Sequence, residues 1–271
     1  MIQLNNVSYC YNENDYALDS VSLEIKKGEF IGIAGRNGSG KSTLIRLING
    51  LLLPLQGNVN VMGMDTMDND SIIGIRKIAG MVFQDPQSQF IGMTVGEDVA
   101  FGPENLGLSH EDICGRVDTS LKAVGMYIYK DHTPRALSGG QKQKVALASI
   151  LAMEPELILF DEATSMLDPV ASEEVLKLIK QLHNKGVTIV YVTHRLEELI
   201  FADRLIIMDK GRIMHDDNPR KLLNEENILD SGIYLPPIIE LSRRLCSEQV
   251  IEPIRLPISR EELMEALCQL M

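Results

Sequence analysis

The first 35 residues alternate between apolar and polar positions over short stretches. Residues 2–9 read IQLNNVSY and residues 18–25 read LDSVSLEI, an alternation typical of strands with one buried face. The turn signal KKGE then precedes FIGIAG, residues 30–35, whose nearly continuous apolar character favours a fully buried strand. We therefore predict an antiparallel piece that leads into a buried strand.

Helical periodicity takes over after this strand. The segment STLIRLIN, residues 42–49, fits a helix, and Gly50 stands where a glycine often ends one. The middle of the chain, about residues 88–152, has almost no strand pattern. Its helical stretches are residues 95–102, residues 110–125 and a helix that begins at Ser138. We interpret residues 88–152 as an inserted helical subdomain.

Strands return in the second half of the chain, where they alternate with helix. ELILFDE at 156–162, VTIVYVTH at 187–194 and RLIIMDKGRIMHD at 204–216 have strand character. A helical segment over 170–186 separates the first two of them. Because this alternation is the pattern of crossover-connected strands, we predict an α/β fold with a mainly parallel sheet.

The character of the chain changes again after about Arg220. The stretches LPPIIE and IEPIRLPIS supply proline breaks that no earlier part of the chain matches. We therefore predict a main domain over residues 1–220 and a C-terminal extension over residues 221–271.

The last segment, SREELMEALCQLM, has the pattern of a short amphipathic helix. Ser259 is followed three residues later by Glu262, which is a capping-box pattern, and an apolar stripe of Leu263, Leu267 and Leu270 follows. Because this stripe must be buried somewhere, we expect the extension to help hold two chains together. The alternative is that the stripe docks on its own domain.

Composition narrows the class of protein. The 271 residues are 45% hydrophobic, and 38 acidic against 26 basic side chains give a formal charge of −12. That charge disfavours direct binding to nucleic acid or to anionic lipid. The four cysteines lie far apart, and we see neither a secretory leader nor an apolar run of the roughly 20 residues that span a bilayer. We expect reduced thiols in a cytoplasmic protein.

A glycine-rich loop joins the buried strand to the first helix. Residues 35–42, GRNGSGKS, match the pattern G-x-x-x-x-G-K-[ST]. The glycines let backbone N–H groups approach phosphates, Lys41 meets the outer phosphate oxygens, and the Ser42 hydroxyl ligates Mg²⁺. This loop, which we call the phosphate loop, predicts a nucleoside triphosphate site.

Two adjacent carboxylates end the predicted strand LILFDE. Asp161 is placed to reach the Mg²⁺ shell, and Glu162 to act near the γ-phosphate as a base or water-positioning group. The alternative is a strand that simply runs into an acidic turn. The phosphate loop in the same chain favours the nucleotide site.

A second candidate anion site lies much later in the chain. LSGGQ, residues 137–141, places a hydroxyl and two glycines at a helix start, where free N–H groups and the helix dipole attract anions. We call residues 138–141 the Ser138 helix start. One bound nucleotide does not require both features.

Other residues are ambiguous by themselves. His194 closes the strand VTIVYVT and either orients a phosphate or a water, or merely caps the strand. Gln84 lies beside a turn. Tyr9 or Tyr11 either stacks on a nucleobase or packs in the core of the N-terminal strand.

Together these motifs resemble those of the ATP-binding cassette (ABC) ATPases. GRNGSGKST, Gln84, LSGGQ, LILFDE, the SMLD of residues 165–168 and His194 occur in the order and approximate spacing of that family, over about residues 1–220. The resemblance implies a P-loop NTPase (RecA-like) core with a mainly parallel sheet, an N-terminal antiparallel β subdomain, the helical insertion and the short C-terminal extension. It implies an ATPase that uses ATP and Mg²⁺.

The resemblance also implies a role for each site residue. The catalytic residues are Lys41, Glu162 and His194, and the Mg²⁺ ligands are Ser42, Gln84 and Asp161. Tyr11 fits the adenine-stacking position better than Tyr9, Gln84 also faces a transmembrane partner, and Asp168 belongs to a loop that couples two subunits. The nucleotide-contacting set is Tyr11, Gly35, Arg36, Asn37, Gly38, Ser39, Gly40, Lys41, Ser42, Thr43, Gln84, Ser138, Gly139, Gly140, Gln141 and Asp168.

In this family the helix start at Ser138 binds the γ-phosphate that the other subunit's phosphate loop holds. Two half-sites on one chain therefore imply two chains around two ATP molecules.

A narrower resemblance comes from QDPQSQFIGMTVGEDVAFGPEN and DEATSMLDP, together with the C-terminal extension. These stretches look like the ATPase subunits of energy-coupling factor transporters, which import vitamins or cobalt and nickel ions. The implied partners are a second ABC ATPase, identical or sibling, an integral-membrane transmembrane subunit and a substrate-binding membrane subunit, at the cytoplasmic face of a prokaryotic membrane and without nucleic acid. Arg36 in the loop and Lys144 in the helix are mild departures that remove no catalytic group.

Other members of the same superfamily remain alternatives. A conventional ABC importer or exporter ATPase stays open, because the cassette motifs do not encode the cargo. In DNA-repair ATPases, CxxC pairs or long coiled coils interrupt the cassette. Translation factors carry two cassettes. Neither of these patterns occurs in this sequence. A degenerate nucleotide sensor would lack the base or the lysine, whereas Lys41, Asp161 and Glu162 are present.

Overall fold

A computed structural model describes residues 1–12, 15–224, 234–251 and 256–268. The strands are β1 (Ile2–Asn12), β2 (Asp15–Ile25), β3 (Phe30–Gly35), β4 (Gln56–Val61), β5 (Met64–Asp65), β6 (Ala79–Val82), β7 (Leu157–Asp161), β8 (Thr188–Val192), β9 (Arg204–Asp209) and β10 (Arg212–Asp217). The helices are α1 (Lys41–Ile48), α2 (Asn69–Ile78), α3 (Val95–Asn105), α4 (His110–Ala123), α5 (Gly139–Leu151), α6 (Pro169–Asn184), α7 (Pro219–Leu222), α8 (Pro237–Ser247) and α9 (Arg260–Cys268). Short 3₁₀ turns are η1 (Pro86–Gln89), η2 (Tyr127–Tyr129), η3 (Pro134–Ala136) and η4 (Leu196–Leu199).

The central sheet is mainly parallel, as the alternating pattern predicts. Its strand order is β10-β9-β3-β8-β7-β6, and only the β9–β10 hairpin is antiparallel. Every residue of β3, β6, β7 and β8 is buried, which explains why these strands lack a polar alternation. The α/β fold class is thereby confirmed.

Each face of this sheet carries its own hydrophobic core. Because side chains alternate between faces along a strand, Leu157 and Leu159 of β7 pack with α1 and the N-terminal sheet. Ile158 and Phe160 point the other way and pack with helices of the insertion and with α6. Helix α1 therefore lies between two sheets, and the phosphate loop that precedes it is anchored from both sides.

The N-terminal sheet is antiparallel, in the order β2-β1-β4-β5. The β1–β2 pair was predicted, but β4, β5, α2 and β6 were not. In β4 only Val59 and Val61 are buried, and α2 buries only Ile75.

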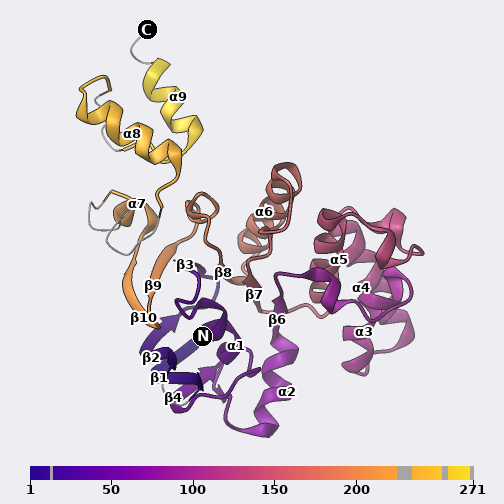
Figure 1. Ribbon diagram of the computed structural model, residues 1–271. Coiled ribbons are helices and arrows are strands. Elements are labelled where there is room, and N and C mark those ends of the chain that lie inside the picture. The colour runs from indigo at the N-terminus through magenta and orange to yellow at the C-terminus, as the bar shows by residue number, and fades with distance from the viewer. Residues whose placement is uncertain (13–14, 225–233, 252–255, 269–271) are drawn as a thin grey trace.

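The predicted helical insertion forms a lobe of α3, α4 and α5 at one side of the central sheet (Figure 1). Side chains define its helix starts. Thr94 caps α3 in a reciprocal capping box with Glu97, and Ser138 does the same for α5 with Gln141. The helix predicted to begin at Ser138 therefore begins there.

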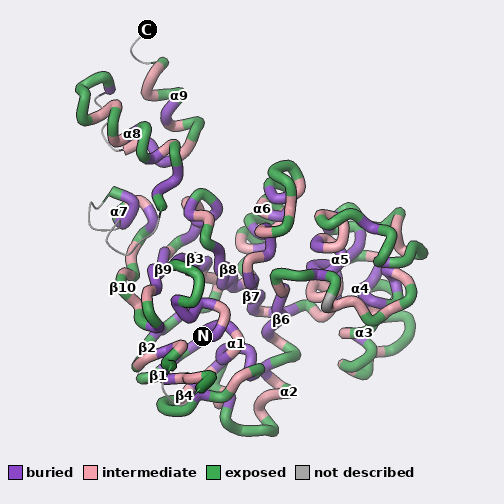
Figure 2. The backbone as a smooth tube through the Cα atoms, viewed as in Figure 1, coloured by how far each residue is buried: buried purple, intermediate pink, exposed green. Residues whose placement is uncertain are grey.

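Helices α8 and α9 of the C-terminal extension lie together, far from the helical lobe in the view of Figure 1. Ser259 accepts a hydrogen bond from the Glu262 N–H, as the expected capping box requires, and the Glu262 carboxylate accepts one from the Ile258 N–H. Leu263 is buried within this chain, and Figure 2 shows buried and exposed stretches alternating along α9. Leu267 is half-buried, and Leu270 lies outside the described residues.

Within the described ranges, no helix is both long enough and apolar enough to cross a lipid bilayer.

Candidate nucleotide site

Strand β3 delivers the phosphate loop to the carboxyl end of the parallel strands. Gly40, the residue before α1, has a φ of +99°, and a Cβ there would lie 2.3 Å from the Ala17 carbonyl oxygen. Gly38 has a φ of +80°, and a Cβ added there would meet no atom within 4 Å, so its backbone faces open space. A left-handed, unobstructed backbone of this kind suits close approach by a phosphate.

Lys41 is the buried cation of the loop. Its side chain is only 5% exposed, and its Nζ donates to the carbonyl oxygens of Gly35 and Arg36, both at 2.9 Å. Burial lowers the pKa of Lys41 from its ordinary value, while the charges of Glu162 and Asp161 oppose that shift. The ammonium is thus held in place without a carboxylate in direct contact.

Ser42 and Asp161 come together from the two predicted motifs. The Ser42 hydroxyl donates to Asp161 Oδ1 at 2.7 Å, and Asp161 is buried. Arg46 Nη2 lies 3.7 Å from the other carboxylate oxygen. A hydroxyl and a carboxylate oxygen side by side are the hard donors that Mg²⁺ prefers, so these residues fit the implied metal.

Glu162 lies at the centre of a polar trio. Its Oε2 is 3.3 Å from His194 Nδ1 and accepts a hydrogen bond of 3.4 Å from Gln84 Nε2. A cavity of about 800 Å³ opens beside them. It is lined by Gly35, Arg36, Asn37, Gln84, Glu162, Ser165, Met166, His194 and Tyr234.

A second cavity, of about 430 Å³, also lies beside the phosphate loop. It is lined by Tyr11, Asp15, Tyr16, Ala17, Asn37, Gly38, Gly40, Lys41, Ser42, Thr43, Gln84 and Glu162. The exposed Tyr11 shares a 3.2 Å hydrogen bond with the Thr43 hydroxyl, whereas Tyr9 meets the Tyr11 ring edge-on and does not line the cavity. Tyr11 is therefore the better placed of the two tyrosines to meet a base.

Four cavity residues outside the recognised motifs escaped the sequence analysis. Asp15, Tyr16 and Ala17 line the second cavity from β2, and Tyr234, just before α8, lines the first. None belongs to a motif, because the fold brings them to the cavities from segments that lie far apart in the sequence. The exposed aromatic pair of Tyr11 and Tyr16 on neighbouring strands was the one available signal.

The Ser138 helix start lies elsewhere on the chain. Among the described residues, none of 138–141 lines either cavity. A Cβ on Gly139 would lie 3.9 Å from Leu167 and Met166, so the Ser138 helix start lies next to the turn that follows Glu162. Asp168, in the same turn, caps α6 by accepting from the Val170 and Ala171 N–H groups. Ser39, which was predicted to contact the nucleotide, is buried in the phosphate loop.

Known proteins show the same cassette. The family described as ABC transporter matches residues 18–165. The energy-coupling factor transporter ATP-binding protein EcfA of Methanosarcina acetivorans is 50% identical over 270 residues, covering 100% of this chain and 98% of that protein. The solved structure of cbiO1 from Clostridium perfringens, part of the ABC transporter complex cbiONQ, has a TM-score of 0.78 at 33% identity, over 92% of this chain and 98% of that one.

A further solved structure is a dimer. The cassette MJ0796, in a post-hydrolysis state bound to ADP and Pi, has a TM-score of 0.74 at 35% identity, over 81% of this chain and 99% of that chain.

Proposed function

The chain belongs to the ABC transporter family and is an ATP-hydrolysing transport ATPase, and from this premise we propose that it is the motor of an energy-coupling factor importer for a vitamin or a transition-metal ion. One observation carries the proposal at the site. Lys41, Asp161 and Glu162 converge at the carboxyl ends of the parallel strands β3 and β7, which lie on either side of β8, and open α/β sheets bind their ligands at such strand ends.

The residues at these strand ends have different roles toward ATP. The phosphate loop and Lys41 hold the phosphates, and Tyr11 stacks on adenine. Ser42, Asp161 and Gln84 would hold Mg²⁺, which would neutralise negative charge on the phosphate oxygens. Glu162 accepts a proton from the attacking water, and His194, 3.3 Å from it, orients the γ-phosphate.

The Ser138 helix start completes the site of a second chain. Gly139 is exposed at the end of α5, and within the described residues its N–H and that of Gly140 have no hydrogen-bond partner. Two such donors at a helix N-terminus suit a phosphate. Because they do not face their own phosphate loop, the partner chain supplies the ATP that they bind, and Asp168 lies beside that contact. The dimeric structure of MJ0796 supports this arrangement.

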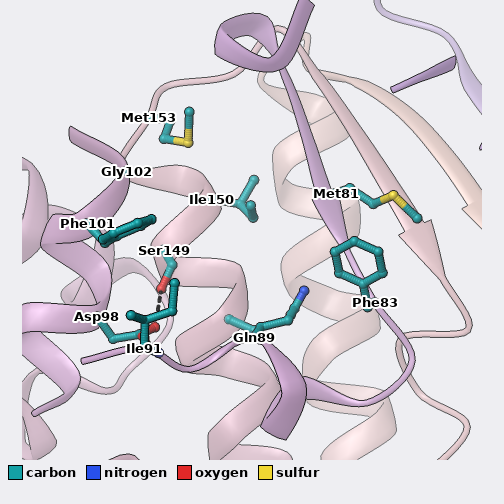
Figure 3. A pocket seen from close by; sticks show the side chains of 11 residues that line it. Met81, Phe83, Gln89, Ile91, Asp98, Phe101, Gly102, Ser149, Ile150 and Met153 are labelled. Carbon is teal, nitrogen blue, oxygen red and sulfur yellow. Dashed lines mark hydrogen bonds between the residues drawn. The ribbon is translucent and has the colours of Figure 1, made fainter. Parts of the chain in front are cut away.

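A third cavity is suited to the integral-membrane partner. Its volume is about 420 Å³, and apolar side chains of β6, α3 and α5 line it, among them Met81, Phe101 and Ile150 (Figure 3). Phe83, at its edge, directly precedes Gln84 of the ATP site. A helix end that binds this cavity from the membrane would be linked to hydrolysis through that connection. The chain then sits at the cytoplasmic face of the membrane.

A conventional ABC importer or exporter is the second candidate, because its ATPase would use the same cassette. The energy-coupling factor type is favoured by relatives that match the whole chain, extension included. The two candidates differ in their partners. An energy-coupling factor complex contains a separate substrate-binding membrane subunit.

Co-purification from native membranes tests the proposal. The wild-type chain is expected to bring down a transmembrane subunit and a small substrate-binding membrane subunit, identified by mass spectrometry. Phe101→Asp places a charge in the cavity and is expected to abolish this capture while ATP binding persists. The matched control is Ile128→Asp, at an exposed apolar position of the same lobe outside the cavity. Partners without a substrate-binding membrane subunit would favour the second candidate.

A further inference from the structure

Glu198 is a buried carboxylate that no motif marks. It lies in η4 and is only 3% exposed. A buried carboxylate is costly unless hydrogen bonds satisfy it, and four side chains do so here. The hydroxyls of Thr164, Tyr191 and Thr193 donate to it at 2.8–3.0 Å, and Arg195 Nη1 does so at 3.2 Å.

These partners flank the two residues at the centre of the ATP site. Thr164 lies two residues after Glu162, and Thr193 and Arg195 stand on either side of His194. The Thr193 hydroxyl also accepts a hydrogen bond of 3.1 Å from the Arg195 N–H, and this bond spans His194. One side chain therefore ties together the turn after β7 and the turn after β8.

Glu162 needs such support because its backbone is strained. Its φ is +50°, in the left-handed region that side chains other than glycine avoid. Residues in such conformations persist when their surroundings over-determine them. The Ser165 N–H and hydroxyl both donate to the Glu162 carbonyl oxygen, and Glu198 fixes Thr164 between these two residues.

We propose that Glu198 is a positioning residue that holds Glu162 and His194 in the relative positions that hydrolysis requires. This inference rests on the proposed roles of Glu162 and His194. Glu198 lines neither cavity beside the phosphate loop, so it acts through Thr164 and Thr193 and does not contact ATP.

Steady-state hydrolysis by the full-length chain provides the test. Glu198→Gln keeps the shape but replaces an acceptor oxygen by a donor. We expect kcat to fall about 10–100-fold, as small displacements of catalytic groups do, with little change in KM or in ATP affinity. Glu197→Gln is the matched control, because Glu197 is the exposed neighbour in the same turn, and it is expected to keep wild-type kcat.

A second pair of variants separates positioning from general stability. Thr164→Val removes the hydroxyl that meets Glu198 and is expected to lower kcat, whereas Thr164→Ser keeps the hydroxyl and restores it. The double variant Glu198→Gln/Thr164→Val is expected to be no slower than the slower single variant, because both break one linkage. This pair also carries the test if Glu198→Gln does not fold.

Several results would overturn the inference. These are a kcat for Glu198→Gln equal to that of Glu197→Gln, a parallel loss of kcat and ATP affinity, or additive effects in the double variant. Glu162→Gln is measured alongside. If it hydrolyses ATP normally, the proposed role of Glu162 fails, whereas an inactive Glu162→Gln with a normal Glu198→Gln overturns only the role of Glu198.

Discussion

The phosphate loop and the Ser138 helix start are both suited to anions, yet they differ in how much of a site they bring. The phosphate loop follows β3 at the carboxyl ends of the buried parallel strands, and Lys41 and two acidic residues lie around it. The Ser138 helix start stands at the exposed N-terminal end of α5, and among the described residues none of 138–141 lines an ATP cavity. From this difference we infer that the phosphate loop forms the core of a nucleotide site, and we propose that the Ser138 helix start completes the site of a second chain.

The largest expected effect separates chemistry from binding at the complete site. Glu162→Gln keeps the size of the side chain but cannot accept the proton of water, so hydrolysis is expected to fall by roughly 10²–10⁴. ATP binding, which depends on the phosphate loop, should persist. Phosphate release and ATP titration on the same sample measure both. Hydrolysis at the wild-type rate would remove Glu162 from the catalytic role.

The next effect concerns affinity. Lys41→Ala deletes the buried cation of the phosphate loop, and loss of charge-assisted hydrogen bonds to phosphate is expected to weaken ATP binding by about 10–100-fold. Lys142→Ala, directly after the Ser138 helix start, is the matched control and should leave the ATP affinity of the isolated subunit unchanged. Calorimetric titration of both variants makes the comparison. Equal losses would mean that the two features serve the same nucleotide.

A smaller effect is expected in the C-terminal extension, where two adjacent residues of α9 differ sharply. Leu263 is 4% exposed and packs within the chain, whereas Met264 is 54% exposed. If the extension holds two chains together, Met264→Asp should weaken nucleotide-free association by about tenfold, through loss of apolar contact area, without lowering stability.

Leu263→Ala is the companion variant, expected to lower the free energy of unfolding and spare association. Sedimentation and urea titration distinguish the two. Unchanged association for Met264→Asp would favour docking of the extension on its own domain alone.

The smallest effect is a pH dependence of stability. Burial lowers the pKa of Lys41 in the folded chain below its unfolded value of 10.5. Between these two values the unfolded chain binds more protons, so the contribution of Lys41 to the free energy of unfolding rises with pH. The free energy of unfolding of the wild type minus that of Lys41→Met should therefore increase as the pH rises toward 10.5. A constant difference in urea titrations would contradict the buried-cation description.

Motifs and strong periodicity were sufficient to predict the parallel sheet, the helical lobe and the meeting of Ser42 with Asp161. Short elements such as β6 escaped, because four apolar residues distinguish no period. The support behind the site also escaped. Glu198 contacts the turns after β7 and β8 from a later segment, and nothing in its neighbours along the chain signals those contacts. The catalytic role of His194 was implied by resemblance and not by the residues themselves, and its contact with Glu162 was not predicted.

The central claim is that the Ser138 helix start binds ATP held by another chain, and Gly139→Asp tests it most directly. A Cβ on Gly140 would lie 2.7 Å from that of Ala171, whereas Gly139 has room for a side chain, so the charge can be placed at Gly139 without an internal clash. Gly139→Asn is the uncharged control of the same shape.

The measurement is ATP-dependent association by light scattering, with ATP affinity determined on the isolated subunit. We predict that Gly139→Asp binds ATP as the wild type does but no longer dimerises on ATP, while Gly139→Asn dimerises more readily than Gly139→Asp, because only the carboxylate repels the partner's γ-phosphate. Normal ATP-driven dimerisation of Gly139→Asp, or loss of ATP affinity in its isolated subunit, would contradict the account.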